Sequence, residues 1–181
     1  MSSFNFNKDP FEHFKTLFAE AEQKITKDPN AMSLATVGPD GFPSLRTVLY
    51  KGWAHDGLTF FTNYQSHKSQ DLNGNSKCAA LFFWPTLERQ IRIEGLVEKL
   101  PRAENEMYFQ SRPRLSQIGA WASEQSQVIP NTEFLESKVI DLEKKYENTT
   151  VPCPPHWGGY CLKPLRIEFW FGRQGRLHER Y

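Results

Sequence analysis

The stretch AMSLATVGPDGFPSLRTVLYKG, residues 31–52, decides the fold. Its first part, Ala31–Val37, predicts a short strand, and the turn formers Gly38-Pro39-Asp40-Gly41 follow directly. Residues Ser44–Lys51 are rich in branched side chains and predict a second strand, which Gly52 ends. A strand, a tight turn and another strand predict a β-hairpin, and a hairpin favours an antiparallel sheet.

Further short strands extend this pattern along the chain. The segments with strand-like patterns are Leu58–Thr62, Cys78–Trp84, Arg89–Lys99, Gly159–Trp170 and Gly175–Tyr181. The early strands follow one another through short links, which again favours antiparallel pairing. Strands with helices inserted late in the chain indicate an α+β protein built on a small barrel.

Helices are predicted before and after the early strands in the sequence. Asp9-Pro10 supplies a capping acid and a proline at the first helical position, and apolar residues then recur at helical spacing as far as Ile25. Residues 101–110 and 132–146 predict two later helices that should cover the sheet. The chain has 181 residues, a length typical of one domain, so we expect residues 1–181 to form a single domain.

Composition narrows the possible partners. The net charge is +1, and 22 basic residues are spread among 21 acidic ones, which argues against nucleic acid. Three cysteines without CxxC spacing argue against a disulfide framework and a structural zinc site, so no metal is expected. The amino-terminal residues lack a signal-peptide pattern, and the longest apolar run is too short to span a bilayer. We therefore expect a cytoplasmic protein without a membrane partner.

The last residues of the chain carry three potential cations. On an extended strand, Arg176, His178 and Arg180 would alternate with their neighbours and point to the same side. Arginine matches phosphate or carboxylate in two-point geometry, and histidine can move a proton near neutral pH. This pattern predicts an anion site. The alternative is a solvated edge strand whose charges prevent pairing with another edge.

Two cations also lie in the second strand of the hairpin. Arg46 and Lys51 are separated by about 16 Å on an ideal strand and point to opposite faces. They either serve different ends of an elongated ligand, or a bulge brings them together. The alternative is an ordinary half-exposed strand.

Two further groups of residues suit a phosphate. A short helix from Ser66 to Leu72 would place Ser66 and Lys68 at its amino terminus, where free N–H groups and the helix dipole favour an anion, although Ser66 is equally explained as a plain N-cap. Tyr108 and Arg112 would share the last helical turn before Pro113, with Ser116 on the following loop. These three form either a phosphate site or a surface capping cluster.

Amide and hydroxyl groups could bind the edge of a heterocycle. Gln90 and the pair Gln125-Ser126 offer such donors and acceptors. The sequence contains no P-loop, GxGxxG or GxSxG motif, which argues against Mg-nucleotide, Rossmann dinucleotide and hydrolase sites.

Six blocks, in order through nearly the whole chain, closely resemble the pyridoxine (pyridoxamine) 5′-phosphate oxidase family, part of the wider group of FMN-binding split β-barrels. The blocks are RTVLYK (46–51), FFTNYQSHK (60–68), RQIRIEG (89–95), YFQSRPRLSQIGAWASEQS (108–126), WGGY (157–160) and EFWFGRQGRLHER (168–180). The resemblance implies an α+β split β-barrel, an antiparallel Greek-key barrel with surrounding helices. It also implies a homodimer with FMN in the groove between the subunits.

The resemblance also implies roles for individual residues. Arg46 and Lys68 resemble ligands of the flavin phosphate, beside His67, which stands where the family usually has an arginine. The other residues implied to bind FMN are Thr47, Val48, Leu49, Lys51, Phe61, Thr62, Gln90, Trp170 and Arg180, with Gln125 and Ser126 from the other subunit. A histidine beside the flavin phosphate would make one of its charges depend on pH.

On the substrate side, the resemblance implies that Lys51, Tyr108, Arg112 and Ser116 hold the 5′-phosphate of the vitamer. Arg176 and His178 would lie over its pyridine ring as catalytic residues. The implied reaction oxidises pyridoxine or pyridoxamine 5′-phosphate to pyridoxal 5′-phosphate with dioxygen. It yields hydrogen peroxide, and ammonia from the amine. The alternatives are a split-barrel flavin oxidase of another substrate, as in phenazine pathways, and a non-catalytic protein that binds FMN or pyridoxal phosphate.

Overall fold

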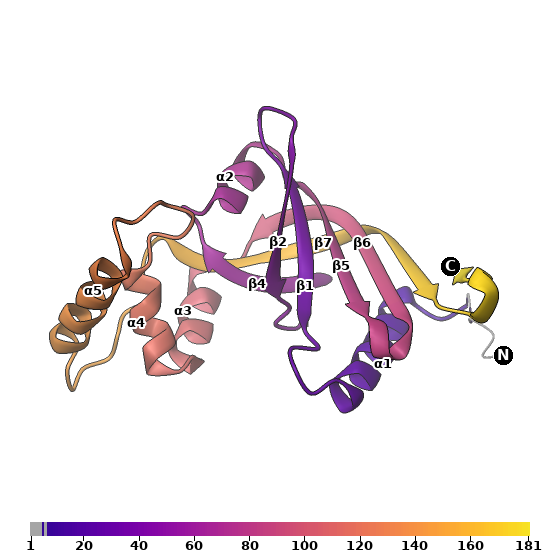
Figure 1. Ribbon diagram of the computed structural model, residues 1–181, viewed down its shortest axis with the longest axis horizontal. Coiled ribbons are helices and arrows are strands. Elements are labelled where there is room, and N and C mark those ends of the chain that lie inside the picture. Colours follow the sequence, from indigo (N-terminus) through magenta and orange to yellow (C-terminus); the bar gives the residue numbers. More distant parts are fainter. Residues whose placement is uncertain (1–4, 6) are drawn as a thin grey trace.

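The computed structural model describes residue 5 and residues 7–181, which form one antiparallel sheet with helices around it (Figure 1). The main path through the sheet is β2-β1-β5-β6-β7-β4-β3, and β8 pairs with β7. β2 also lies against β4, near the other end of the path, so the sheet curls back on itself. The strands are β1 Ala31–Val37, β2 Pro43–Leu49, β3 Trp53–Ala54, β4 Gly57–Asn63, β5 Lys77–Trp84, β6 Arg89–Lys99, β7 Trp157–Phe171 and β8 Glu179–Arg180.

The predicted hairpin is confirmed as β1 and β2. Their register runs from Ala31 opposite Leu49 to Val37 opposite Pro43. Gly41, in the connecting turn, has a φ of 80°, a conformation that glycine adopts at little cost. β2 ends two residues before the predicted Lys51, because the amide of Lys51 already donates to Thr59 O of β4.

The predicted helices are present, and one further helix is added. Among the described residues, the α-helices are α1 Pro10–Lys24, α2 His67–Gly74, α3 Arg102–Ser111, α4 Arg114–Ala122 and α5 Thr132–Lys145, and the short 3-10 helices are η1 Pro85–Leu87 and η2 Gln174–Arg176. Asp9 caps α1 by accepting from Phe11 N, as its sequence predicts. α3, α4 and α5 lie at one end of the molecule, and the carboxyl terminus lies at the other (Figure 1).

Two expectations about local structure are wrong. Ser116 lies in α4 and not on a loop, because Pro113 ends α3 but also occupies the N-cap of the next helix. Proline lacks an N–H group and has a fixed φ, so it starts a helix as readily as it stops one. The segment 175–181 is also not a continuous strand. Gly175 and Arg176 have φ values of 66° and 60°, and only Glu179–Arg180 pairs with β7.

Most of the buried apolar residues in the described structure fall into two clusters. The larger one fills the barrel and packs α1 against the sheet through Phe14 and Ala21, which are both fully buried. The smaller one contains Phe109, Ile118, Val151, Cys153 and Trp157, and it fastens α3 and α4 to the start of β7. At roughly 1.5–3 kcal/mol for each fully buried large apolar side chain, this second cluster is sufficient to fix the helices that carry part of the site.

Cys78, Cys153 and Cys161 are free and buried, and burial raises the pKa of Cys78 to about 12. In the part of the chain that the structure describes, no group of His, Cys, Asp or Glu could hold a metal ion. No helix among the described residues is both long enough and apolar enough to cross a membrane.

Candidate functional site

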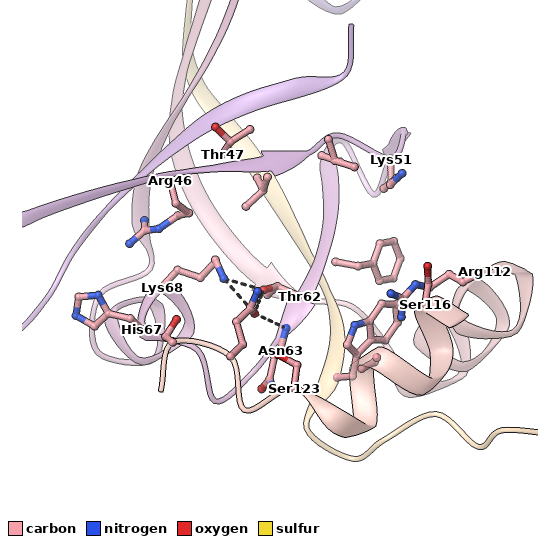
Figure 2. A pocket seen from close by; sticks show the side chains of 18 of the residues that line it. Arg46, Thr47, Lys51, Thr62, Asn63, His67, Lys68, Arg112, Ser116 and Ser123 are labelled. Carbon is pink, nitrogen blue, oxygen red and sulfur yellow. Dashed lines mark hydrogen bonds between the residues drawn. The ribbon is translucent and has the colours of Figure 1, made fainter. Parts of the chain in front are cut away.

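A cavity of about 1010 Å³ lies between β2, β4, α2, α4 and the segment after α4 (Figure 2). Its volume is at the upper end of the range of about 300–1,000 Å³ that is usual for small-molecule sites. The predicted residues that line it are Arg46, Thr47, Val48, Leu49, Lys51, Phe61, Thr62, His67, Lys68, Tyr108, Arg112, Ser116, Gln125 and Ser126. Among the described residues, four arginines and lysines line this cavity and no aspartate or glutamate does.

The cations gather at two ends of the cavity. Figure 2 shows Arg46, His67 and Lys68 toward one end and Lys51, Arg112 and Ser116 toward the other. Arg46 and Lys51 therefore face one cavity although they are five residues apart. The regular strand ends at Leu49, so strict alternation no longer sets the direction of Lys51. This arrangement fits the expectation that the two residues serve different ends of an elongated ligand.

Lys68 is a buried cation held by neutral groups. Lys68 is only 6 % exposed. Its Nζ donates to Thr62 Oγ1 at 2.9 Å, Ser66 Oγ at 3.0 Å and Gln125 Oε1 at 3.3 Å. No carboxylate in residues 7–181 forms an ion pair with it. Burial, and to a lesser extent the charge of Arg46, lowers the pKa of Lys68 to about 8. An anion in the cavity would supply the missing opposite charge.

Ser66 does not act as the plain N-cap that was the alternative reading. Its hydroxyl makes no capping bond to α2 and donates to Asn63 O at 2.7 Å. The same oxygen accepts from Lys68 Nζ, so Ser66 fixes the position of the ammonium group.

Hydrogen bonds within the chain hold the guanidinium of Arg46 in place. Its Nη1 donates to Thr36 Oγ1 at 2.7 Å and to two backbone carbonyls of Leu34 and Ser44. Thr36 in turn donates to Asp71 Oδ2 at 2.6 Å, and that oxygen lies 3.8 Å from Arg46 Nη2. Burial lowers the pKa of Arg46, and the charge of Asp71 partly offsets this shift.

Asp71 and its surroundings were not predicted. The carboxylate is 2 % exposed, lies outside the cavity lining and faces His67 Nε2 at 3.6 Å. A Cβ atom on Gly38, in the turn between β1 and β2, would lie 2.9 Å from Asp71 Oδ1, which is closer than real Cβ contacts. The only signal for Asp71 in the sequence is its position four residues after His67 on a short helix.

The other end of the cavity is built on α3 and α4. The Arg112 guanidinium lies over the rings of Trp157 at 4.7 Å and Phe109 at 5.5 Å. Burial lowers its pKa, and its buried Nη1 has no hydrogen-bond partner within the described residues. Tyr108 stacks on Phe61 with ring centroids 3.9 Å apart, and Trp157, also not predicted, continues the stack. Aromatic faces hold a guanidinium without using its N–H donors, so Arg112 remains able to bind an anion.

Among the remaining predicted residues, Gln90, Trp170, His178 and Arg180 form a second cluster outside this cavity. Gln90 pairs in register with Trp170, Trp170 pairs with Arg180, and the Trp170 and His178 rings are 4.7 Å apart. Arg176, His178 and Arg180 are exposed, at the end of the molecule opposite α4 (Figure 1). The expectation that Arg176, His178 and Arg180 share one strand face is wrong, because Arg176 lies in η2 with a positive φ.

The expected origin of Gln125 also needs correction. The resemblance placed Gln125 and Ser126 on the other subunit, but both line the cavity of their own chain, and Gln125 Oε1 accepts from Thr62 and Lys68. The segment after α4 turns back toward α2, and Ser126 has a φ of 68° in this turn.

Comparisons with known proteins agree with this geometry. Residues 18–146 match a family model described as pyridoxamine 5′-phosphate oxidase, and residues 157–181 match one described as the pyridoxine 5′-phosphate oxidase C-terminal dimerisation region. The pyridoxine/pyridoxamine 5′-phosphate oxidase of Leptospira biflexa is 52% identical, over 95% of this chain and 81% of its own length. That of Cupriavidus metallidurans is also 52% identical, over 99% of this chain and 84% of its own length.

A solved structure confirms the fold. PhzG from Burkholderia lata, in complex with tetrahydrophenazine-1-carboxylic acid, superposes with a TM-score of 0.89 at 29% identity, over 95% of this chain and 84% of that one. The predicted α+β split β-barrel is therefore correct. The family model covers more than half of the sequence, and the two relatives match it almost from end to end. The chain belongs to the pyridoxamine 5′-phosphate oxidase family.

Proposed function

We propose that this enzyme oxidises pyridoxine 5′-phosphate and pyridoxamine 5′-phosphate to pyridoxal 5′-phosphate, with FMN as cofactor and dioxygen as acceptor. Membership of the family identifies FMN as the cofactor. The observation that carries the proposal is one cavity with cations at two separate ends, the buried Lys68 at one and the half-buried Arg112 at the other, and no acidic lining residue among those described. Two phosphates, one on the cofactor and one on the substrate, account for two such ends.

The residues present fit a flavin phosphate at the Lys68 end. Lys68 is buried without a carboxylate partner within the described residues, and Arg46 lies beside it, so a phosphate would be bound by two charges. Val48, Leu49 and Phe61 give the adjoining wall an apolar surface suited to a flat ring. We assign Arg46, Thr62 and Lys68 to the cofactor phosphate and assign Gln125 and Ser126 to the cofactor as well.

The vitamer phosphate is assigned to the Arg112 end. Arg112 presents a buried, unpartnered N–H group, and Tyr108, Ser116 and Lys51 line the same part of the cavity. With both phosphates fixed, the pyridine ring would lie against the flavin between them. Holding two reactants in contact in this way removes much of the entropic barrier to reaction.

When bound, FMN supplies the redox chemistry by accepting a hydride from C4′ of the vitamer and passing the electrons to dioxygen. The residues of the chain bind and orient the cofactor and the vitamer, and they tune the charge around them. Arg173 N donates to His178 Nδ1 at 3.1 Å, so a neutral His178 carries its proton on Nε2. We assign Arg176 and His178 to the pyridine ring of the substrate. They hold this ring and influence its protonation.

We propose that the working unit is a homodimer in which one subunit completes the cavity of the other. Gln90, Trp170, Arg176, His178 and Arg180 do not line the cavity of their own chain. The last four lie in the segment that matches the family's dimerisation region. β2 also exposes apolar residues among those that line the cavity, with Leu45 70% exposed and Leu49 40% exposed. An exposed apolar edge of this kind is typical of an interface.

The dimer is tested by Leu45→Glu. A charge on β2 should prevent burial of this edge, so we expect a monomer in analytical ultracentrifugation and at least a tenfold loss of FMN affinity. Ile140→Glu serves as control, because Ile140 is 63% exposed on α5 and lies outside the cavity. A Leu45→Glu protein of dimer mass that binds FMN normally would contradict this assembly.

FMN binding should weaken as the pH rises above about 8. In the free protein Lys68 loses its proton near this pH, whereas a bound phosphate favours the charged ammonium, so binding then requires proton uptake. We expect the FMN affinity to fall by up to about tenfold per pH unit between pH 8 and 9. Flavin fluorescence titrations at pH 7, 8 and 9 measure this change. A constant affinity across that range would show that Lys68 stays charged without the ligand.

The reaction is tested directly with purified protein and added FMN. We expect oxygen uptake and peroxide release with both phosphorylated vitamers, and much less with unphosphorylated pyridoxamine. The likeness to PhzG favours a second candidate, oxidation of a reduced phenazine carboxylic acid. Such a ligand carries no phosphate, so only its carboxylate could occupy the Arg112 end. Oxygen uptake with a reduced phenazine acid but not with the vitamers would select that function, and binding of pyridoxal phosphate without oxygen uptake would indicate a non-catalytic protein.

We further propose a cytoplasmic location. All three cysteines are free and buried, which fits a reducing compartment.

A further inference from the structure

We propose that Gln117 is a positioning residue for the substrate-side anion site, where it fixes Arg112 relative to Ser116 before the ligand binds. This inference rests on the proposed assignment of that site to the phosphate of the vitamer. Gln117 itself is 7 % exposed and does not line the cavity, so it acts through its neighbours.

α3 and α4 meet in a corner formed by Arg112 and Pro113. Arg112 has extended backbone angles, φ −77° and ψ 151°, and Pro113 is the N-cap of the next helix. The last carbonyls of a helix lack partners within it, and Pro113 has no N–H group to offer them. Unless another donor satisfies these carbonyls, the corner is free to change its angle. Arg112 and Ser116 lie on opposite sides of that corner.

Gln117 supplies a side-chain donor at this corner, in addition to Arg112 N, which donates to Phe109 O at 3.2 Å. Its Nε2 lies 3.0 Å from Arg112 O, 3.2 Å from Phe109 O and 3.2 Å from Gln110 O. One amide group has two hydrogens, so the three carbonyls share them. A side chain from the first half of α4 therefore binds the end of α3 and the residue between the helices, which sets the angle of the corner.

This contact acts on the binding groups at both sides of the corner. The carbonyl of Arg112 is held by Gln117, and its guanidinium is held by the faces of Trp157 and Phe109. Ser116 directly precedes Gln117 on α4, so the same contact sets its place relative to Arg112 (Figure 2). Every holding group is neutral, and the charge of Arg112 stays available to an anion. A preorganised site of this kind binds its ligand with less loss of entropy.

Glutamine is suited to this position by both length and charge. Glutamate has the same length, but its ionised form has no donor and would place a negative charge beside three carbonyl oxygens. Methionine has a similar length and shape but cannot donate. Both substitutions therefore remove the bonds with little change in volume.

The test compares Gln117→Met with Gln110→Met. Gln110 is a matched control, because it is an exposed glutamine of α3 whose Nε2 donates to Val151 O at 2.9 Å without joining α3 to α4. For Gln117→Met we expect the KM for pyridoxamine 5′-phosphate to rise about tenfold. The kcat should change less than threefold, and the Kd for FMN less than twofold. Gln110→Met should change none of these values more than twofold.

A second measurement keeps this inference separate from the proposed reaction. Inorganic phosphate, added to the FMN-loaded protein, should raise the melting temperature of the wild type and of Gln110→Met, and should do so less for Gln117→Met. This shift does not depend on turnover, so it tests the positioning role even if the wild type oxidises neither vitamer. Gln117→Glu should behave like Gln117→Met. An unchanged KM and phosphate shift, an equal loss of FMN and phosphate binding, or failure of both variants to fold would each overturn the proposal.

Discussion

Lys68→Met is expected to lower the affinity for FMN about 100-fold. Lys68 is the buried cation at the proposed phosphate end, and in the free protein its only partners among the described residues are hydroxyl and amide oxygens. Removing a charged donor from a phosphate costs about 1.5–3 kcal/mol per bond, and 2.7 kcal/mol corresponds to roughly 100-fold. Fluorescence titration of the apoprotein with FMN gives the Kd.

Riboflavin and a second lysine provide the controls for this result. Riboflavin has no phosphate, so its affinity should change less than about threefold in Lys68→Met. Lys77→Met, on an exposed position of β5, should leave both affinities unchanged. The apoprotein of Lys68→Met should also melt at a higher temperature at pH 7, because its folded state no longer buries a cation whose pKa is lowered. Equal losses of FMN and riboflavin affinity would place the flavin phosphate elsewhere.

Arg112→Met is expected to raise the KM for pyridoxamine 5′-phosphate about 100-fold while FMN still binds. Its guanidinium lies on the faces of two aromatic rings, and its buried Nη1 has no partner in the described structure. The variant loses both the charge and the two-point geometry that suit a phosphate. Steady-state oxygen uptake at a range of vitamer concentrations measures KM, and fluorescence titration measures FMN.

Two further arginine variants sharpen this prediction. Arg112→Lys keeps the charge but loses the fork, so its KM should lie between those of the wild type and Arg112→Met. Arg114→Met is the matched control, because Arg114 is exposed on α4 and donates to Tyr146 O and Thr149 O outside the cavity. If Arg112→Met kept a normal KM but bound FMN poorly, the two phosphate assignments would have to be exchanged.

The sequence predicted the parts of the site that lie on regular local structure. Arg46 and Lys68 belong to a strand and a short helix whose positions follow from turn residues and apolar patterns, and both reached the cavity. Thr36, Asp71, Gln117 and Trp157 were missed for a common reason. Their roles depend on contacts between elements that are distant in the sequence, such as the bond between Thr36 and Asp71. No local spacing encodes such a contact.

Two errors came from rules that hold only for regular backbone. Strand alternation would align Arg176 with His178, but Gly175 and Arg176 adopt positive φ values that alternation does not foresee. The rule that proline ends a helix predicts a loop at Ser116, but Pro113 also begins α4 and so places Ser116 on a helix. The second cluster, around Trp170, lies outside the cavity of its own chain, whereas the resemblance assigned only Gln125 and Ser126 to the other subunit.

The close approach of Gly38 to Asp71 constrains how this sequence can diverge. Any side chain at position 38 would press on a carboxylate that is already bonded to Thr36 and close to Arg46. Position 38 can therefore accept a larger residue only when position 71 becomes smaller or turns away. Among related sequences the two positions should vary together, although one lies at the tip of a hairpin and the other on a helix far along the chain.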